Sequence, residues 1–250
     1  MPALKAVARA IIAVAVAVML TSVLALLQQQ IYAREHYAAA QEKPISTSSI
    51  EDPFDFLNSR VWKIGNYEVS YGTFNPTNVA VSNGMLQLSV PAGLSEGGQI
   101  QTLERFSYGR FGCRMKTNGV MNTCTSLFTY YREPGVVGCD QIAAEIYSSK
   151  PDQMLITTYK LDKPTNEKQW KIINLGFDSN LAFHDYEIAW YRDHIDISVD
   201  GLLRASLADT NYLPTHPQCF LLTCFNTSWK GPAPVTATAS IESAWIRPLT

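Results

Sequence analysis

The sequence predicts an all-β fold, a jelly-roll sandwich, preceded by one transmembrane helix. Three observations support this prediction: short runs of alternating apolar and polar residues, turn signals between those runs, and one long apolar segment near the N-terminus. After that segment no long stretch has the 3.6-residue periodicity of a helix. Many short strands with long connections in one domain of this size are typical of a jelly roll.

The apolar segment is residues 10–27, "AIIAVAVAVMLTSVLALL", which carry no charge and follow Lys5 and Arg9. At about 1.5 Å per residue this helix nearly spans a bilayer core of about 30 Å. The alternative is a cleavable signal peptide, whose apolar stretch is usually about 7–15 residues and whose cleavage site needs a small residue where Ile31 stands. We expect an uncleaved anchor with residues 1–9 in the cytoplasm, because the basic residues precede the span.

The next segment, residues 28–52, is polar, contains Pro44 and "STSS", and is typical of a tether. The folded domain is then expected over residues 53–250. With this topology the chain is a single-pass protein of the inner membrane, with its domain in the periplasm or outside the cell.

Ten runs in the domain are expected to form strands, because their apolar residues recur at every second position. The dipeptides Asn83-Gly84, Asn118-Gly119 and Asp200-Gly201 are expected to be tight turns. The expected strands are 85–90, 97–106, 108–116, 124–131, 138–146, 153–160, 185–191, 194–200, 219–225 and 237–248.

Composition excludes several classes of protein. Hydrophobic residues make up 46% of the chain and charged residues 17%, which suits a folded domain and not a disordered chain. The net charge of −2 gives no signal for nucleic-acid binding. The four His residues are scattered without metal-ligand spacing, so the sequence predicts no metal site and no cofactor. A mildly acidic exported domain with aromatic residues suits a neutral ligand such as a glycan.

Five blocks in order resemble family 16 of the glycoside hydrolases, the lichenase, laminarinase and xyloglucan transglycosylase group. The resemblance runs from about Pro53 to the C-terminus and implies a concanavalin-like jelly roll with an open cleft across its concave sheet. The longest block, residues 171–204, is similar to the bacterial lichenases. The blocks are "YGRFGCRMK", "TSLFTYY", "DQIAAEI", "KIINLGFDSNLAFHDYEIAWYRDHIDISVDGLLR" and "SAWIRPL".

The block "DQIAAEI" resembles the catalytic strand of that family, which reads Glu-x-Asp-x-Glu after an Asp. By this resemblance Asp140 is the preceding Asp, Gln141 takes the position of the nucleophile, Ala143 that of the middle Asp, and Glu145 that of the acid/base. Taken alone, this segment is typical of an ordinary half-buried strand without a catalytic role. The family blocks on both sides favour a former or altered active site.

The retaining mechanism needs two carboxyl groups about 5–5.5 Å apart. Gln141 matches Glu in size, but its neutral amide oxygen is a very poor nucleophile. Ala143 lacks the carboxylate that would tune its neighbours. Glu145 therefore has no charged neighbour on its strand, and we expect no rise of its pKa from carboxylate repulsion.

Other positions of the implied cleft also depart from the family. Gln99 and Gln101 stand where lichenases have Glu and Arg, and Thr223 stands at an Asn. The resemblance implies that these three residues also contact the substrate. Ser243 replaces an Asp that helps to hold calcium in some relatives, so no calcium is expected there. Aromatic side chains that can stack on sugars persist, and we expect a substrate-binding surface from Phe128, Tyr130, Tyr159 and Phe225, with Trp229 as a further candidate.

The five Cys residues include one pair with the spacing of a cross-strand disulfide. A two-residue turn at Asn118-Gly119 would place Cys113 opposite Cys124. Directly opposed residues have Cα atoms about 4.5–5.5 Å apart, which fits disulfide geometry. We therefore expect a disulfide between Cys113 and Cys124.

Three functions remain open from the sequence. The first is a membrane-anchored pseudoenzyme that binds a β-glucan-like polysaccharide or the inner-membrane synthase and export proteins that make one. The second is an active glycoside hydrolase or transglycosylase in which Glu145 acts as acid and Gln141 orients water or an acetamido group of the substrate. The third is a structural subunit with a closed cleft.

Overall fold

Two β-sheets pack face to face in a computed structural model, which describes residues 45–69, 72–227 and 231–249. These strands belong to one unit, Lys43–Arg132 together with Val136–Thr250. The eight-stranded sheet runs in the order β15 (Leu202–Leu207), β14 (Ile195–Val199), β13 (His184–Trp190), β8 (Gly109–Lys116), β17 (Ala237–Pro248), β6 (Met85–Val90) and β5 (Val79–Ser82), with β1 (Ile50–Asp52) paired to β17.

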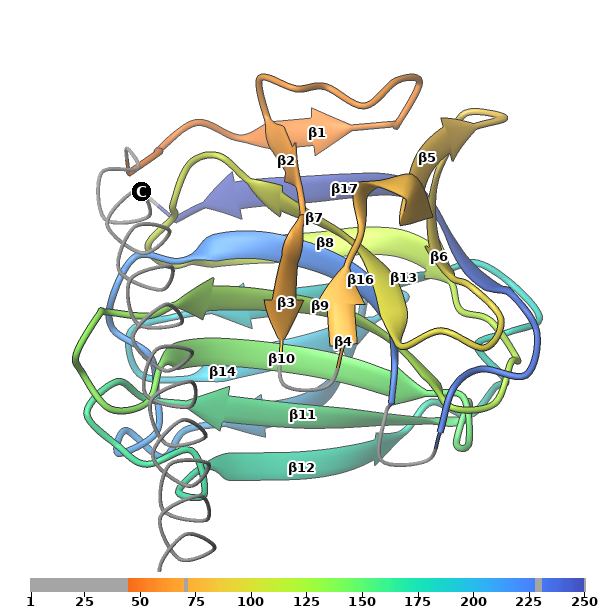
Figure 1. Ribbon diagram of the computed structural model, residues 1–250. Coiled ribbons are helices and arrows are strands. Elements are labelled where there is room, and N and C mark those ends of the chain that lie inside the picture. Colours follow the sequence, from red (N-terminus) through yellow and green to blue (C-terminus); the bar gives the residue numbers. More distant parts are fainter. Residues whose placement is uncertain (1–44, 70–71, 228–230, 250) are drawn as a thin grey trace, which may run out of the picture. The chain divides into compact units, whose positions relative to one another are not determined.

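The nine-stranded sheet lies across the other side of the core (Figure 1). A 3-10 turn, η1 (Pro76–Asn78), connects its strand β4 to β5 of the first sheet. The order is β12 (Gln169–Asn174), β11 (Gln153–Tyr159), β10 (Asp140–Tyr147), β9 (Thr123–Tyr131), β16 (Cys219–Asn226), β7 (Glu96–Thr102), β4 (Gly72–Phe74) and β3 (Tyr67–Val69), with β2 (Trp62–Ile64) paired to β7.

The core between the sheets is aromatic at its centre. Phe220 of β16 and Phe111 of β8 come from opposite sheets, and their ring centroids are 5.8 Å apart. Trp62 also packs against Phe220, with ring centroids 6.4 Å apart. Burying a large apolar side chain of this kind stabilises the fold by about 1.5–3 kcal/mol. This packing confirms the predicted all-β sandwich.

Each of the ten predicted runs contains a strand. The prediction missed β1 to β5, which have only three or four residues each and are too short for a periodic signal. It also missed β12 and β15, which each form one edge of a sheet. Edge strands have several exposed positions, so their apolar pattern is weak.

Two of the three predicted turns are confirmed. Asn83 and Gly84 have φ values of 55° and 67° and connect β5 to β6, while Asp200 and Gly201 have values of 51° and 74° and connect β14 to β15. Positive φ at both central residues is the signature of a type I′ hairpin turn.

The third predicted turn, Asn118-Gly119, is wrong. Neither residue has a positive φ, and the segment carries the chain from β8 in one sheet to β9 in the other. The Asn118 side-chain oxygen instead accepts hydrogen bonds from the Val120 amide at 3.0 Å and the Thr123 hydroxyl at 2.9 Å. These bonds hold a crossing between sheets in place of a hairpin.

The predicted disulfide is wrong for the same reason. Cys113 lies in β8 and faces the core, whereas Cys124 lies in β9 of the other sheet, on the face that points away from the core. The two thiols therefore cannot meet across the sandwich. All five cysteines are buried, and none of them forms a disulfide in the described residues.

The N-terminal predictions are tested only in part. Residues 1–9, the predicted anchor 10–27 and the tether up to residue 44 lie outside the described residues. Within residues 45–69, 72–227 and 231–249, no helix has the length and apolarity needed to cross a bilayer. The tether was predicted to reach residue 52, but Ile50–Asp52 pairs with β17, so the folded domain begins earlier than predicted.

The five thiols should be unreactive in the native protein. Burial raises the pKa of Cys139 and Cys224 to about 11 each, and it raises the pKa of Cys113 and Cys124 as well. We expect negligible labelling by a thiol reagent without denaturant and five labelled thiols per chain in unreduced, denatured protein. Fewer than five labels in denaturant, counted by intact mass, would show a disulfide.

Candidate functional site

Strand β10 lies inside the nine-stranded sheet, third from the β12 edge and between β9 and β11 (Figure 1). Alternate residues of the strand, Ile142, Ala144 and Ile146, face the core. The intervening residues lie on the opposite face of the sheet, as the alternation predicts. We call this face, defined on β10 by Gln141, Ala143, Glu145 and Tyr147, the site face.

From β10 toward β7, the residues that lie level with Glu145 across the sheet are polar and uncharged, whereas its neighbour on the other side, Leu155 of β11, is apolar. Glu145 lies opposite Ser126 of β9, followed by Thr223 of β16 and Gln99 of β7. The hydroxyls of Ser126 and Thr223 are 2.6 Å apart, and the Gln99 side-chain oxygen accepts a hydrogen bond from the Tyr67 hydroxyl at 2.5 Å. Gln99 and Thr223, both predicted to bind substrate, are each only 1% exposed and form the floor of the face.

The middle row passes through Ala143, which lies opposite Phe128 of β9 and Thr157 of β11. Beyond Phe128 the row continues to Leu221 and then to Gln101, the third of the predicted polar contacts with substrate. Ala143 offers no functional group, and its neighbours cover it almost completely. The position between the two ends of the motif therefore contributes neither charge nor hydrogen bond from its side chain.

The third row passes through Gln141, which lies between Tyr130 and Tyr159. Both rings are half-buried, as is Phe128, whose ring contacts Tyr130 edge to face at 6.5 Å. The structure thus brings together three of the four predicted cleft aromatics around Gln141 and Ala143. Lys168 lies beside them, with its ammonium group 5.5 Å from the centre of the Tyr159 ring.

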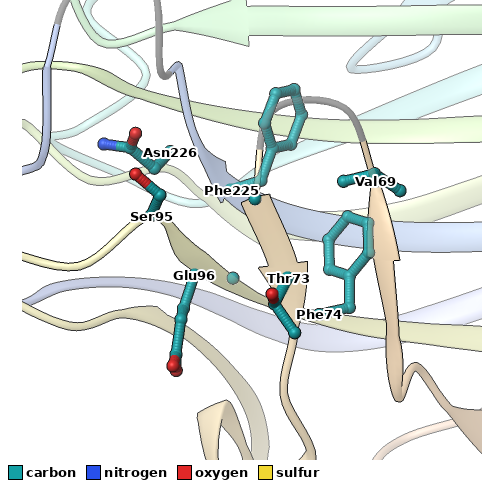
Figure 2. Close-up of a pocket in the computed structure, with 9 residues that line it drawn as sticks. Val69, Thr73, Phe74, Ser95, Glu96, Phe225 and Asn226 are labelled. Carbon is teal, nitrogen blue, oxygen red and sulfur yellow. The ribbon is translucent and has the colours of Figure 1, made fainter. Parts of the chain in front are cut away.

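The fourth predicted aromatic, Phe225, lies in a separate cluster. It is 9% exposed and packs with Phe74 and Cys124, in the row that also contains Tyr147. Figure 2 shows Phe225 and Phe74 beside a hollow that Ser95 and Glu96 also line. The volume of this hollow is about 10 Å³, which suits one water molecule and not a sugar ring. Trp229 lies outside the described residues.

Glu145 is the one residue of the motif that can exchange a proton. Burial raises its pKa to about 7, while a hydrogen bond from the Tyr147 hydroxyl and the nearby charge of Lys168 act in the opposite direction. No carboxylate contributes to the rise, as expected from the loss of the motif's other acids. The sequence alone did not predict the effect of burial on the pKa of Glu145. Strand alternation could have identified Tyr147, because it lies two residues after Glu145 and therefore on the same face.

The carboxylate of Asp140 accepts hydrogen bonds that hold the fold together. Its carboxylate is fully buried and accepts hydrogen bonds from the backbone amides of Leu161 at 2.7 Å, Thr215 at 2.9 Å and His216 at 2.8 Å. The His216 ring nitrogen Nδ1 lies 2.9 Å from the same carboxylate. Asp140 therefore anchors two loops at the end of β10, and it is not free to act as a nucleophile.

Glu145 is the only carboxylate on the site face of β7, β9, β10, β11, β12 and β16, as far as these strands are described. Across the described ranges, His, Cys, Asp and Glu side chains nowhere gather in the groups of three that a metal ion requires. The arrangement can donate or accept a proton at one point. It offers no second acid with which to complete a displacement.

Replacing Glu145 by Gln should stabilise the fold at neutral and alkaline pH. The folded protein binds the Glu145 proton more tightly than the unfolded chain, so stability is lost as the pH rises from about 4.5 to about 7. Glu145→Gln removes this loss, a gain of at most about 3 kcal/mol above pH 7 and little below pH 4.5. Urea unfolding at several pH values tests this. An equal effect at every pH would contradict it.

Comparisons with known proteins agree with this geometry. The profile of glycosyl hydrolases family 16 matches residues 66–247. A beta-glucanase of Paenibacillus polymyxa is 28% identical over 192 residues, which cover 72% of this chain and 79% of that protein. The endo-1,3-1,4-beta-glycanase ExoK of Rhizobium meliloti is 26% identical over 196 residues, which cover 73% and 72%.

Solved structures show the same fold. A prokaryotic beta-1,3-1,4-glucanase (lichenase) derived from a mouse hindgut metagenome superposes with a TM-score of 0.70 at 22% identity, covering 81% of this chain and all of that one. The Crh5 transglycosylase gives a TM-score of 0.66 at 16% identity and covers 83% of this chain and 87% of its own. The family profile spans most of the domain, and the sandwich around β10 is the one these proteins share. The chain belongs to glycosyl hydrolases family 16.

Proposed function

We propose that this protein binds a β-glucan-like polysaccharide on the site face of the nine-stranded sheet and does not hydrolyse it. The observation that carries the proposal is the set of side chains at the three motif positions of β10. Gln141, Ala143 and Glu145 share one face of β10, and Glu145 is the only acid among them. The named activities of the relatives, beta-glucanases in most cases, suggest the class of ligand.

The chemistry of glycoside hydrolysis supports the absence of turnover. A retaining enzyme needs a second carboxylate about 5–5.5 Å from the acid, and an inverting enzyme needs one about 6.5–9.5 Å away to activate water. Gln141 cannot ionise and is a very poor nucleophile. Asp140 is fully buried and hydrogen-bonded to two loops. On the described strands of the site face, therefore, neither mechanism finds its second acid.

Binding makes smaller demands than catalysis. Stacking on a sugar requires an accessible ring face and the loss of water between the two surfaces, with no charged pair in register. Phe128, Tyr130 and Tyr159 are half-buried and lie in adjacent rows of the site face. A shallow surface of this kind suits modest affinities, with dissociation constants between about 1 mM and 1 μM.

Glu145 favours a second candidate, an active hydrolase or transglycosylase with an altered mechanism. A carboxyl group with a pKa of about 7 suits general acid catalysis at neutral pH. In that case Gln141 would position water or an acetamido group of the substrate. Product formation that is lost in Glu145→Ala would establish this candidate.

The floor of the site face favours a third candidate, a structural subunit with a closed cleft. Gln99, Ser126 and Thr223 are almost inaccessible, and they are bonded to each other or to neighbouring side chains. A protein of this kind would bind no glycan at all. Binding measurements therefore separate it from the first proposal.

Wild-type protein should bind β-glucan and leave it intact. Calorimetry against lichenan and laminarin measures the binding, and chromatography of the same samples measures any products. Tyr130→Ala should weaken binding several-fold, because its ring is part of the stacking surface, and Gln141→Glu with Ala143→Asp should at most restore trace hydrolysis. Robust wild-type turnover would refute the proposal, and so would the absence of binding to every β-glucan tested.

The same proposal places the domain at the inner membrane, held by residues 10–27 with its fold in the periplasm or cell exterior. The support is the uncharged length of that segment and the basic residues before it. A tethered glucan-binding domain would stay beside the polysaccharide synthase or export proteins and hold their product.

The mature chain should therefore retain residues 1–27 and remain with membranes after alkaline extraction. Added protease should digest a periplasmic domain only after the outer membrane is permeabilised, and a domain at the cell exterior without permeabilisation. Intact mass and N-terminal sequencing supply the check. A mature chain that begins after residue 27 would contradict the anchor and leave the glucan-binding proposal standing.

A further inference from the structure

We propose that Trp170, on the edge strand β12, forms an additional stacking position for the glucan at the outer end of the site face. This inference rests on the proposed function and extends it, because it predicts a preference for long chains. Strand β12 was missed by the strand prediction, and Trp170 is not among the residues expected from the sequence to bind substrate.

Strand register places Trp170 in the middle row of the site. Trp170 of β12 lies opposite Thr157 of β11, which lies opposite Ala143 of β10, which lies opposite Phe128 of β9. The four strands are side by side in Figure 1. Three strand spacings of about 4.8 Å separate the backbones of Trp170 and Phe128 by about 14 Å.

The two residues between these rings have small side chains and are almost completely buried. Thr157 is 3% exposed and Ala143 is 1% exposed. An Asp at position 143, as in the family motif, would project a charged group into the middle of this row. With alanine there, the stretch of the row from Phe128 to Trp170 has an aromatic ring at each end and two small, uncharged residues between them, which suits an extended neutral chain lying across the strands.

Trp170 is exposed in a way that core packing does not explain. Its exposed fraction is 60%, compared with 2% for Trp62 and 0% for Trp190, which belong to the core. Ile172, two residues further along β12 and on the same face, is 52% exposed. Together they form a small apolar patch that continues the proposed binding surface to the edge of the sheet.

A glucan chain fits this patch better than a second protein. Two side chains offer at most about 400 Å² of contact, whereas a stable protein interface buries more than about 1,000 Å² in total. One sugar ring, by contrast, needs only one aromatic face. Lys168, exposed and beside Tyr159, adds hydrogen-bond donors for sugar hydroxyls next to the ring.

The distance between the Phe128 and Trp170 rings predicts that binding depends on the length of the glucan chain. A short oligosaccharide can occupy the Phe128 end or the Trp170 end, but only a longer chain reaches both. Loss of the Trp170 ring should therefore weaken the binding of polymer and leave the binding of a trisaccharide nearly unchanged.

The test uses the full chain in detergent and calorimetry with lichenan polymer and with a lichenan trisaccharide. Trp170→Ala should weaken polymer binding about tenfold, or about 1.4 kcal/mol, with little change for the trisaccharide. Trp170→Phe should recover most of the affinity. Phe56→Ala is the matched control and should have no effect. Phe56 is 66% exposed and belongs to the segment between β1 and β2, which lies far from β12 (Figure 1).

Tryptophan fluorescence gives a second readout. Lichenan should shift the emission of wild-type protein to shorter wavelength, and the shift should be largely absent in Trp170→Phe, which keeps a ring at this position. If wild-type protein binds polymer and Trp170→Ala binds it equally well, the inference is wrong and the proposed function stands. If wild-type protein binds no glucan, the proposed function fails and the inference fails with it.

Discussion

The pairing of β10 between β9 and β11 is the constraint on which the rest of the site depends. Alternation within β10 buries Ile142, Ala144 and Ile146 in the core, and this burial fixes which residues face outward. A slip of one residue would exchange the two sets and place apolar side chains in water. The same register aligns Gln141 with two tyrosines and Glu145 with a row of hydroxyls.

Strand architecture and catalytic chemistry are separable in this fold. Asp140 accepts hydrogen bonds from two loops and holds the end of β10, a role that needs its charge but no substrate. Gln141 and Ala143 lack charge, yet neither disturbs the strand, since the site face is not part of the core. Catalysis requires two acids in register, whereas stacking requires only rings. A sheet of this kind can therefore lose hydrolysis and retain a binding surface.

Local patterns predicted the parts of this structure that depend on local physics. Long alternating runs and the dipeptides Asn83-Gly84 and Asp200-Gly201 were identified correctly, because side-chain period and positive φ are properties of short segments. The turn at Asn118-Gly119 was not, since tertiary hydrogen bonds to Asn118 direct the chain into the other sheet. The raised pKa of Glu145 likewise was not predicted, because it follows from burial and a local sequence pattern does not give the burial of a side chain. Trp170 was overlooked because an edge strand alternates weakly.

The central claim is that the site face has no nucleophile, and covalent trapping tests it most directly. An activated 2-deoxy-2-fluoro glucan oligosaccharide captures the glycosyl–enzyme intermediate of retaining enzymes, because the fluorine slows its hydrolysis. Intact-mass spectrometry after long incubation should show unmodified wild-type protein, with an active family 16 beta-glucanase labelled under the same conditions. A stoichiometric adduct on any side chain of the site face would contradict the account.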